Sequence, residues 1–325
     1  MRIAVSSPVA RSSLESGIGR LGVELVWADD DELPALSAEV DGIVMLGSSY
    51  GPRMAEALGA QGNRCTWLQL LSTGYEQLLL YGVPPGIEVS NAGAAWSPIV
   101  AEHAMALLMA WVRRVPQLVA SQAQGRWDES VRAGMGMLFG GRMTIVGMGR
   151  IGAELSTRAR AFGMTVVGVT RSGKPHPAAD EMFPVARLHE ALAGADVVIV
   201  VVPLSDATRQ LIDAAALAAC SRSAVIVNIA RGPVVDQAAL VRALSLGAIA
   251  GAVLDVTDPE PLPADHPLWR MPNVIVSPHI GGAAPARYNE RIADLVIANV
   301  GARLRGEPVS DRLDALGPAI ADAAR

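Results

Sequence analysis

Short apolar runs of strand type alternate with amphipathic helical stretches along nearly the whole chain. Residues 2–91 hold five such runs: RIAVSS, VELVWA, DGIVMLG, CTWLQLL and IEVSN. Residues 143–278 hold six more: MTIVGMG, MTVVGV, DVVIVVV, AVIVNIA, AGAVLDV and NVIVSP. Strands that alternate with helices are typical of βαβ units. The pattern therefore predicts an α/β protein with two doubly wound parallel sheets of five or six strands, because one sheet of eleven would be unusually wide.

Helical segments separate the two groups of strands and also follow the last one. From residue 97 the apolar positions recur at helical spacing, and we expect a long helix that starts at Ser97–Pro98 and a second helical segment after Pro116. Residues 291–306 are helical as well. The chain would then leave one domain near Ala92 and re-enter it near Ala284. We predict one domain from residues 1–92 and 285–325, and a second domain from residues 93–284.

Composition and charge narrow the class of protein. With 325 residues, of which 51% are hydrophobic and 18% charged, the chain can bury the cores of about two domains. A net charge of -5 argues against a nucleic-acid partner. The first residues, MRIAVSS, form a strand rather than a signal peptide, and the apolar runs are shorter than the ~20 residues of a membrane helix. We expect a cytoplasmic protein without a membrane partner.

The two cysteines, Cys65 and Cys220, have no C-x-x-C spacing. Neither a disulfide framework nor a thiolate metal site is indicated, and both residues are expected to be small buried side chains.

Gly147, Gly149 and Gly152 form a G-x-G-x-x-G motif that follows an apolar strand and opens a helix. In this context Gly147 permits a tight turn, Gly149 lets the backbone approach a pyrophosphate, and Gly152 lets helix and strand pack closely. The helix N-terminus offers free N–H groups to phosphate. A purely structural glycine turn is the alternative, but the context predicts a Rossmann-like dinucleotide site.

Polar side chains stand where later strands end: Pro203 lies in one such loop, and Arg231, Asp255, Glu260 and His279 follow the next three strands. Each has an ordinary structural interpretation: Arg231 as a solvated charge, Glu260 as a turn cap, His279 as a core histidine. In open α/β sheets, however, ligands bind at the carboxyl edge. Their occurrence together at that edge favours a site.

The stretch from Gly147 to Gly282 resembles the D-isomer-specific 2-hydroxyacid dehydrogenases, closest to their glyoxylate and hydroxypyruvate reductase branch. The motifs that carry the resemblance, in the order of the family, are GMGRIG, VPLSDATRQLI, NIARGPVVD, LDVTDPEPLP, HPLW and SPHIGG. LLSTGYEQL, VSNAG and IVAEHAMALL extend it more loosely over the first half. In this family the nucleotide domain is inserted into the substrate domain, which matches the two crossings.

The resemblance implies a catalytic trio and no metal. His279 would exchange a proton with the substrate, Glu260 would orient and charge its ring, and Arg231 would grip the substrate carboxylate and adjacent carbonyl. The formate-oxidising branch pairs its histidine with Gln, so Glu260 argues against that activity.

The resemblance also implies which residues surround the two ligands. The substrate pocket would include Ser48, Trp96 and the backbone amides of Thr73 and Gly74, with Ser49, Tyr50 and Tyr75 as further candidates; the three aromatic residues could equally be packing residues. Glu76, where many relatives carry Asp, is a mild departure. The cofactor would be held by Gly147, Gly149, Arg150, Ile151, Gly152, Thr170, Arg171, Ser172, Lys174, Val202, Pro203, Thr208, Ile229, Ala230, Asp255 and Gly281, with Asp255 near the nicotinamide carboxamide.

One departure concerns the choice of cofactor. In VVGVTRSGKPH, residues 166–176, Thr170 stands where NAD-dependent relatives place an acidic residue on the ribose hydroxyls. The change removes a repulsion of the 2'-phosphate of NADP, and Arg171, Ser172 and Lys174 can bind that group. A solvated basic turn is the alternative. We predict that NADP is preferred, with NAD possible.

The predicted function is reduction of a small 2-oxo acid by hydride transfer. A dinucleotide-sensing scaffold of the same fold and a phosphite dehydrogenase are the alternatives.

The segment from Ser97 to Arg132 carries more apolar surface than a linker helix needs, on Leu107, Leu108, Trp111, Val115, Leu118 and Trp127. In the family that the chain resembles, the matching helices form a two-fold interface, so the resemblance implies a homodimer.

Overall fold

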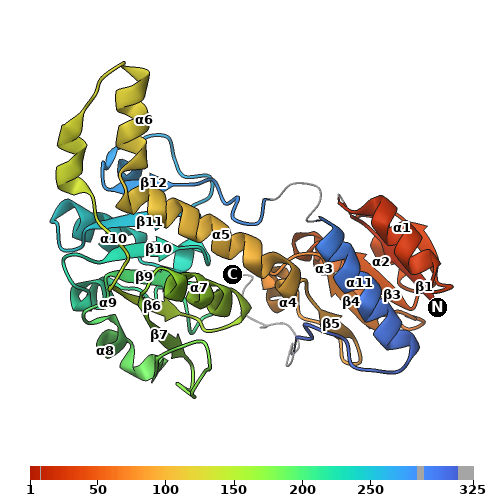
Figure 1. Cartoon of the computed structure of the whole chain (residues 1–325). Coiled ribbons are helices and arrows are strands. Elements are labelled where there is room, and N and C mark those ends of the chain that lie inside the picture. Colours follow the sequence, from red (N-terminus) through yellow and green to blue (C-terminus); the bar gives the residue numbers. More distant parts are fainter. Residues whose placement is uncertain (8, 284–288, 314–325) are drawn as a thin grey trace. The chain divides into compact units, whose positions relative to one another are not determined.

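The structure is a computed structural model that describes residues 1–7, 9–283 and 289–313. The chain divides into two compact units, Met1–Trp96 with Ala284–Arg325, and Ser97–Ala283 (Figure 1). The first unit ends four residues later than predicted, at Trp96 instead of residue 92, and resumes one residue earlier, at Ala284 instead of residue 285. The crossing expected near Ala284 lies outside the described residues. The roles of the two units as substrate and nucleotide domains stay a prediction.

The first unit contains a five-stranded parallel sheet in the order β2-β1-β3-β4-β5. Its strands are β1 (Arg2–Val5), β2 (Glu24–Trp27), β3 (Gly42–Met45), β4 (Trp67–Leu70) and β5 (Glu88–Ser90). Its helices are α1 (Arg11–Gly19), α2 (Leu33–Leu36), η1 (Gly47–Ser49), α3 (Pro52–Gly59), α4 (Glu76–Tyr81) and α11 (Asn289–Leu304).

Both faces of this sheet are buried, because successive side chains of a strand point to opposite sides. Ile3 and Val5 pack with residues of α1 and α11, whereas Ala4, between them, packs with residues of α2, α3 and α4. The first and last helices of the described residues, α1 and α11, therefore share a core. A Cβ on Gly17 of α1 would lie 2.1 Å from Cδ1 of Ile297, so a larger residue would require the Ile297 side chain to move.

The second unit contains a seven-stranded parallel sheet in the order β12-β11-β10-β9-β6-β7-β8. Its strands are β6 (Arg142–Val146), β7 (Thr165–Thr170), β8 (Glu181–Pro184), β9 (Val197–Val200), β10 (Val225–Asn228), β11 (Gly251–Leu254) and β12 (Val274–Val276). Its helices are α6 (Val115–Ala123), η2 (Glu129–Gly134), α7 (Arg150–Ala161), η3 (Val185–Arg187), α8 (Leu188–Leu192), α9 (Ala214–Ala219), η4 (Gly232–Val234), α10 (Gln237–Ser245) and η5 (Pro267–Arg270). The helix α5 (Gly93–Val112) begins in the first unit and continues in this one.

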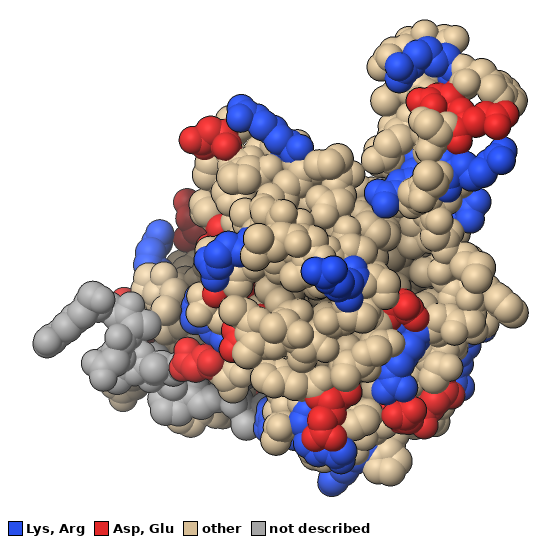
Figure 2. Space-filling model, turned by 90° about the vertical axis from the view of Figure 1, so that its left-hand side faces the viewer, with Lys and Arg blue, Asp and Glu red and all other residues tan. Residues whose placement is uncertain are grey.

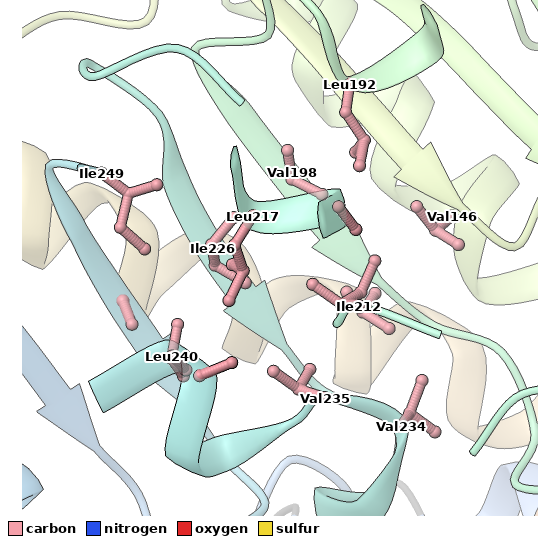
Figure 3. Close-up of a cluster of buried hydrophobic side chains, with 14 of the residues drawn as sticks. Val146, Leu192, Val198, Ile212, Leu217, Ile226, Val234, Val235, Leu240 and Ile249 are labelled. Atoms are coloured by element: carbon pink, nitrogen blue, oxygen red, sulfur yellow. The ribbon is translucent and has the colours of Figure 1, made fainter. Parts of the chain in front are cut away.

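The same alternation builds this core. Val198 and Val200 of β9 pack with residues of α8, α9 and α10, and Figure 3 shows Val198, Ile226, Leu217 and Leu240 directed toward one another in this cluster. Val197 and Ile199 instead face α5 and α7. Two parallel sheets with helices on both faces confirm the predicted fold class.

The prediction of eleven strands missed β8, so the larger sheet has seven strands rather than six. The sequence EMFP is short, ends in proline and pairs on one side only, with β7. Its side chains are exposed or half-buried, so this short edge strand carries little apolar patterning.

The predicted start of α5 at Ser97–Pro98 is wrong, because the helix begins at Gly93 and contains Pro98. The side-chain oxygen of Asn91 accepts a hydrogen bond from the Gly93 amide, which caps the helix four residues earlier. By length and composition alone, Ala95–Val112 could cross a membrane, but half of this window is buried in the protein, as in a core helix.

After α5, the chain forms an arm from α6 and η2 that projects from the second unit in Figure 1. On the face of the molecule shown in Figure 2, basic and acidic side chains are interspersed. Both cysteines are free, and burial raises the pKa of each thiol to about 11. Cys65 is buried as expected, whereas Cys220 is half-buried.

Candidate active site

The glycine motif lies in the turn from β6 to α7. Gly147 has a φ of 114°, and a Cβ there would lie 2.6 Å from the carbonyl oxygen of Val201, so a side chain is excluded by conformation and by space. A Cβ on Gly152 would lie 2.3 Å from the Gly147 carbonyl oxygen. At Gly149, by contrast, a Cβ would meet nothing within 4 Å. The turn is tight on its inner side and open at Gly149, where the first N–H groups of α7 begin.

The basic turn begins at the end of β7. The hydroxyl of Thr170 accepts a hydrogen bond of 3.0 Å from the Gly173 amide, and Gly173 has a φ of 64°. Arg171, Ser172 and Lys174 are exposed. The side chain of Thr170 therefore closes the turn locally, and its neighbours are directed to the surface.

The loops after β9 and β10 bring five more predicted residues to the same edge. Thr208 donates a 2.6 Å hydrogen bond to the carbonyl of Pro203, which follows the half-buried Val202. Ile229 and Ala230 are buried, and the Ala230 amide donates to the side chain of Asn228. In each loop, a hydrogen bond between a side chain and a backbone group therefore holds the chain in place.

Arg231 follows directly, and its Nη1 donates a 2.7 Å hydrogen bond to the Ala230 carbonyl. The next residue, Gly232, touches the loop after β11, because a Cβ there would lie 1.9 Å from the carbonyl oxygen of Thr257. The half-buried guanidinium therefore projects from a loop that is packed directly against the loop carrying Glu260.

Asp255, at the end of β11, is a buried carboxylate that accepts several hydrogen bonds. It accepts from the hydroxyl of Ser277 at 2.7 Å, from the amides of Ile280 and Gly281 at 3.1 and 2.9 Å, and contacts Nε2 of His103 at 3.1 Å. Burial raises the pKa of Asp255, but these hydrogen bonds outweigh burial and hold its pKa below the usual value. Asp255 is therefore an anion that organises the loop after β12.

His279 and Glu260 form the closest pair of titratable side chains at this edge. Nδ1 of His279 lies 2.8 Å from Oε2 of Glu260, and the other carboxylate oxygen accepts from the Thr257 amide at 3.1 Å. His279 has a φ of 53°, which is rare for a residue with a side chain, and its amide donates to the Asp255 carbonyl at 2.8 Å. Because an ionised carboxylate only accepts, Nδ1 carries the hydrogen, which leaves Nε2 for chemistry.

Strand order explains how these residues meet. His279, Asp255 and Arg231 follow the adjacent strands β12, β11 and β10, whereas the glycine turn follows β6 and Thr170 is the last residue of β7. The order reverses at β6, and ligands of doubly wound sheets bind at such a reversal. An open glycine turn, a helix N-terminus and a polar strand end fit the pyrophosphate and ribose of a dinucleotide. The nicotinamide end would then face the half that holds His279.

The candidate substrate residues of the first unit lie at the carboxyl ends of β3 and β4. Ser48 is exposed in η1, and a Cβ on Gly47 would lie 2.3 Å from the Gly74 carbonyl oxygen, so η1 touches the loop of Thr73 and Gly74. Ser72 bridges the two, because its hydroxyl accepts from the Gly47 amide and donates to the Gly74 carbonyl, both at 3.0 Å. The structure therefore brings Ser48, Thr73 and Gly74, the predicted substrate residues, close together.

The other pocket candidates of this unit are partly committed to packing. Tyr50 is fully buried, its hydroxyl donates to the Gly82 carbonyl at 2.7 Å, and burial raises its pKa. Trp96 donates from its indole N–H to the Leu71 carbonyl at 2.8 Å and packs on the core with one side. Tyr50 is thus a packing residue, while Trp96 is half-buried beside the loop that follows β4.

Sequence reasoning assigned no role to His103 or Ser277. Both lie inside quoted motifs, but a single histidine on an apolar helix and a serine before proline give no signal of their own. Their contact joins residues 174 positions apart, which only the fold reveals.

The comparisons with known proteins agree with this geometry. Residues 105–281 match the family model described as D-isomer specific 2-hydroxyacid dehydrogenase, NAD binding domain. The chain is 33% identical over 297 residues to the glyoxylate reductase/hydroxypyruvate reductase of Homo sapiens, covering 88% of this chain and 89% of the relative. It is also 33% identical over 288 residues to the glyoxylate/hydroxypyruvate reductase B of Yersinia enterocolitica, covering 86% of each chain.

A solved structure extends the similarity to the fold of almost the entire chain. The D-isomer specific 2-hydroxyacid dehydrogenase from Xanthobacter autotrophicus, in complex with NADPH and MES, superimposes with a TM-score of 0.81 at 28% identity over 96% of this chain and 98% of the other. On these grounds, the chain belongs to the D-isomer-specific 2-hydroxyacid dehydrogenase family.

Proposed function

We propose that this NAD(P)-dependent dehydrogenase reduces a small 2-oxo acid of the glyoxylate and hydroxypyruvate type, with NADPH as the preferred cofactor. The observation that carries the proposal is the pairing of His279 with Glu260 at 2.8 Å, at the sheet edge that also bears the glycine turn. The relatives from Homo sapiens and Yersinia enterocolitica, named as reductases of these two acids, support the choice of substrate.

In the proposed mechanism, a bound reduced nicotinamide supplies the hydride for the carbonyl carbon. His279, protonated on both ring nitrogens, donates the proton on Nε2 to the carbonyl oxygen, so that the product is the 2-hydroxy acid. Glu260 holds the hydrogen on Nδ1 and stabilises the imidazolium before the transfer. Arg231 binds the substrate carboxylate and carbonyl oxygens with its planar guanidinium.

The loop of Thr73 and Gly74, in the first unit, offers groups that suit a substrate carboxylate. The amides of Thr73 and Gly74 donate no hydrogen bond within the described part of the chain. The loop is nevertheless anchored, because the Asn91 side chain donates to the Thr73 carbonyl at 3.0 Å. Two consecutive N–H groups in an anchored loop suit an anion. Ser48 and Trp96 would complete the pocket.

The preference for NADPH rests on the turn after β7. Thr170 is neutral, and Arg171 and Lys174 are exposed beside it at the strand end that meets the ribose in doubly wound folds. The structure of the Xanthobacter autotrophicus relative was solved with NADPH, which supports the same choice.

We expect a panel of substrates to separate this function from its alternatives. With NADPH, kcat/KM should be highest for glyoxylate or hydroxypyruvate and lower for bulkier 2-oxo acids, and phosphite should not be oxidised with NADP⁺. Initial rates from nicotinamide absorbance measure each value. Tight NADPH binding without turnover of any 2-oxo acid would favour the sensing scaffold, and oxidation of phosphite would favour the phosphite dehydrogenase. A cytoplasmic location belongs to the same proposal.

A homodimer built on the arm is a further part of the proposal. Leu108 is buried in the protein's own core, and Trp111 donates to the Asn273 carbonyl, so these predicted interface residues pack internally. Other apolar residues at or near the arm are exposed: Val115, Leu118, Val119, Trp127, Met137 and Phe139. Such a surface suits an apolar interface of more than ~1,000 Å².

Sedimentation velocity at micromolar concentration is expected to show a dimer. Leu118→Asp should convert it to a monomer, because a carboxylate would be buried without a partner. Leu246→Asp, at an exposed leucine outside the arm, is the control and should leave the dimer intact. A wild-type monomer would contradict the dimer, and an unaffected Leu118→Asp dimer would exclude the arm as its interface.

A further inference from the structure

We infer that His103 is a positioning residue that holds the catalytic loop of His279 through Asp255 and Ser277. The inference rests on the proposed role of His279. His103 lies on α5, and its Nε2 contacts Oδ1 of Asp255 and Oγ of Ser277, both at 3.1 Å. The ring is 20% exposed and the carboxylate 4% exposed, so both contacts are shielded from solvent.

The hydrogen bonds of the trio define where the hydrogens lie. Ser277 donates its hydroxyl hydrogen to Asp255 at 2.7 Å, so its oxygen can accept. The ionised carboxylate of Asp255 also only accepts. Nε2 of His103 must therefore carry a hydrogen that it shares between the two. A Ser, His and Asp in contact resemble a hydrolase triad, but here both bonds use the same ring nitrogen, so the histidine cannot relay a proton from serine to aspartate.

Asp255 transmits this support to the catalytic loop. Its carboxylate accepts from the amides of Ile280 and Gly281, and its carbonyl accepts from the amide of His279. These bonds hold three consecutive amides around a single residue, and they hold His279 at a φ of 53°. Positive φ is unfavourable for histidine, so the loop depends on its hydrogen bonds to keep this conformation. A shift of Asp255 would move the ring of His279 relative to Glu260.

The contact between α5 and the loop is close as well as polar. A Cβ on Gly281 would lie 2.7 Å from Oδ2 of Asp255 and 3.4 Å from Cδ2 of His103. The imidazole, the carboxylate and the loop backbone thus touch without space for another side chain. His103 comes from a helix 152 residues away from Asp255, so it fixes the loop from outside its own segment.

We propose to compare His103→Leu, which removes the N–H, with His103→Gln, whose amide N–H can reach the position of Nε2. His103→Leu should lower kcat about ten- to hundredfold, as expected when a catalytic group is misplaced by a fraction of an ångström to one ångström. KM for the 2-oxo acid should change less than about threefold. The Kd for NADPH from fluorescence titration should also change little, because the glycine turn and the Thr170 turn, which would bind the pyrophosphate and the ribose phosphate, belong to β6 and β7 and not to the strands beside His103. His103→Gln should recover most of kcat. Glu102→Leu, at the exposed neighbour on the same helix, is the control and should match the wild type.

A double-variant analysis and an NMR comparison test the same inference in two further ways. Ser277→Ala removes one acceptor of the His103 N–H, and the double variant with His103→Leu should lose less than the product of the single losses, because the two residues act together. The chain has five histidines, so imidazole NMR signals can be assigned. The signals of His279 should move in His103→Leu and remain in place in His103→Gln.

Wild-type kcat in His103→Leu, equal losses in the Leu and Gln variants, or multiplicative losses in the double variant would each overturn the inference. A wild-type protein without turnover of any 2-oxo acid would instead overturn the proposed function. In that case the NMR comparison still decides the positioning role: unmoved His279 signals in His103→Leu would refute it, and moved signals would support it.

Discussion

Replacing His279 with alanine is expected to lower kcat by about two to four orders of magnitude, the largest effect of any change proposed for this protein. The variant loses the proton donor that Glu260 orients through the 2.8 Å bond to Nδ1. The Kd for NADPH should be nearly unchanged, because the side chain of His279 is not among the predicted cofactor-binding groups and the glycine turn and the Thr170 turn belong to other strands. Stopped-flow or steady-state absorbance with saturating glyoxylate measures kcat, and fluorescence titration measures binding.

Two companion variants make the assignment specific. Glu260→Gln keeps the size of the side chain but removes the charge that stabilises the imidazolium, so its kcat should fall between those of the wild type and His279→Ala. His189→Ala removes an exposed histidine of α8 and should behave like the wild type. If His279→Ala retains wild-type kcat, the proton is donated by another group and the assignment is wrong.

Replacing Arg171 with alanine is expected to weaken NADPH binding about ten- to hundredfold and to leave NADH binding nearly unchanged. A hydrogen bond between a guanidinium and a phosphate contributes about 1.5–3 kcal/mol, and only NADPH carries the 2'-phosphate. The preference of the wild type for NADPH should also decline as salt rises, since the turn is exposed. Fluorescence titration with both cofactors at two ionic strengths gives four dissociation constants for the wild type and four for Arg171→Ala.

The reverse change should shift the preference. Thr170→Asp would place a carboxylate at the strand end, where it can accept from ribose hydroxyls and repel the phosphate, so NADH should become the preferred cofactor. Arg222→Ala, at an exposed arginine outside the site, is the control for general charge. Equal affinities of the wild type for NADH and NADPH would refute the predicted preference, and an unaltered NADPH affinity in Arg171→Ala would place the phosphate elsewhere.

Much of this site could be predicted because the fold obeys simple rules. Parallel strands such as VVIVVV are buried on both faces and therefore read as continuous apolar runs, and their carboxyl ends must share an edge. That rule led to the prediction of Arg231, Asp255 and His279 as site residues, and the contacts of Asp255 with the loop of His279 are consistent with their shared edge. Strand β8 was missed because it is a short edge strand whose side chains are exposed or half-buried.

Other features depended on contacts that no local pattern records. The start of α5 was misplaced because Ser97–Pro98 is a strong local signal, whereas the cap supplied by Asn91 depends on a side-chain bond. His103 was missed because its partners lie more than 150 residues away. The predicted interface was partly wrong in the same way, since Leu108 packs inside the protein, and burial of one apolar residue among many is decided by the fold.

In the turn that follows β7, the residues that fix the backbone are different from the residues that would select the cofactor. Its ends are anchored by the Thr170 hydroxyl and by Gly173, where a Cβ would lie 2.3 Å from the backbone nitrogen of Pro184, while positions 171 and 172 lie in solvent. An aspartate at position 170 could cap the Gly173 amide just as threonine does. Randomising 171 and 172 together with a Thr/Asp choice at 170 would thus form a compact library for cofactor engineering. Screening this library for the ratio of NADPH to NADH affinity would show whether the cofactor preference can change while the backbone of the turn is kept.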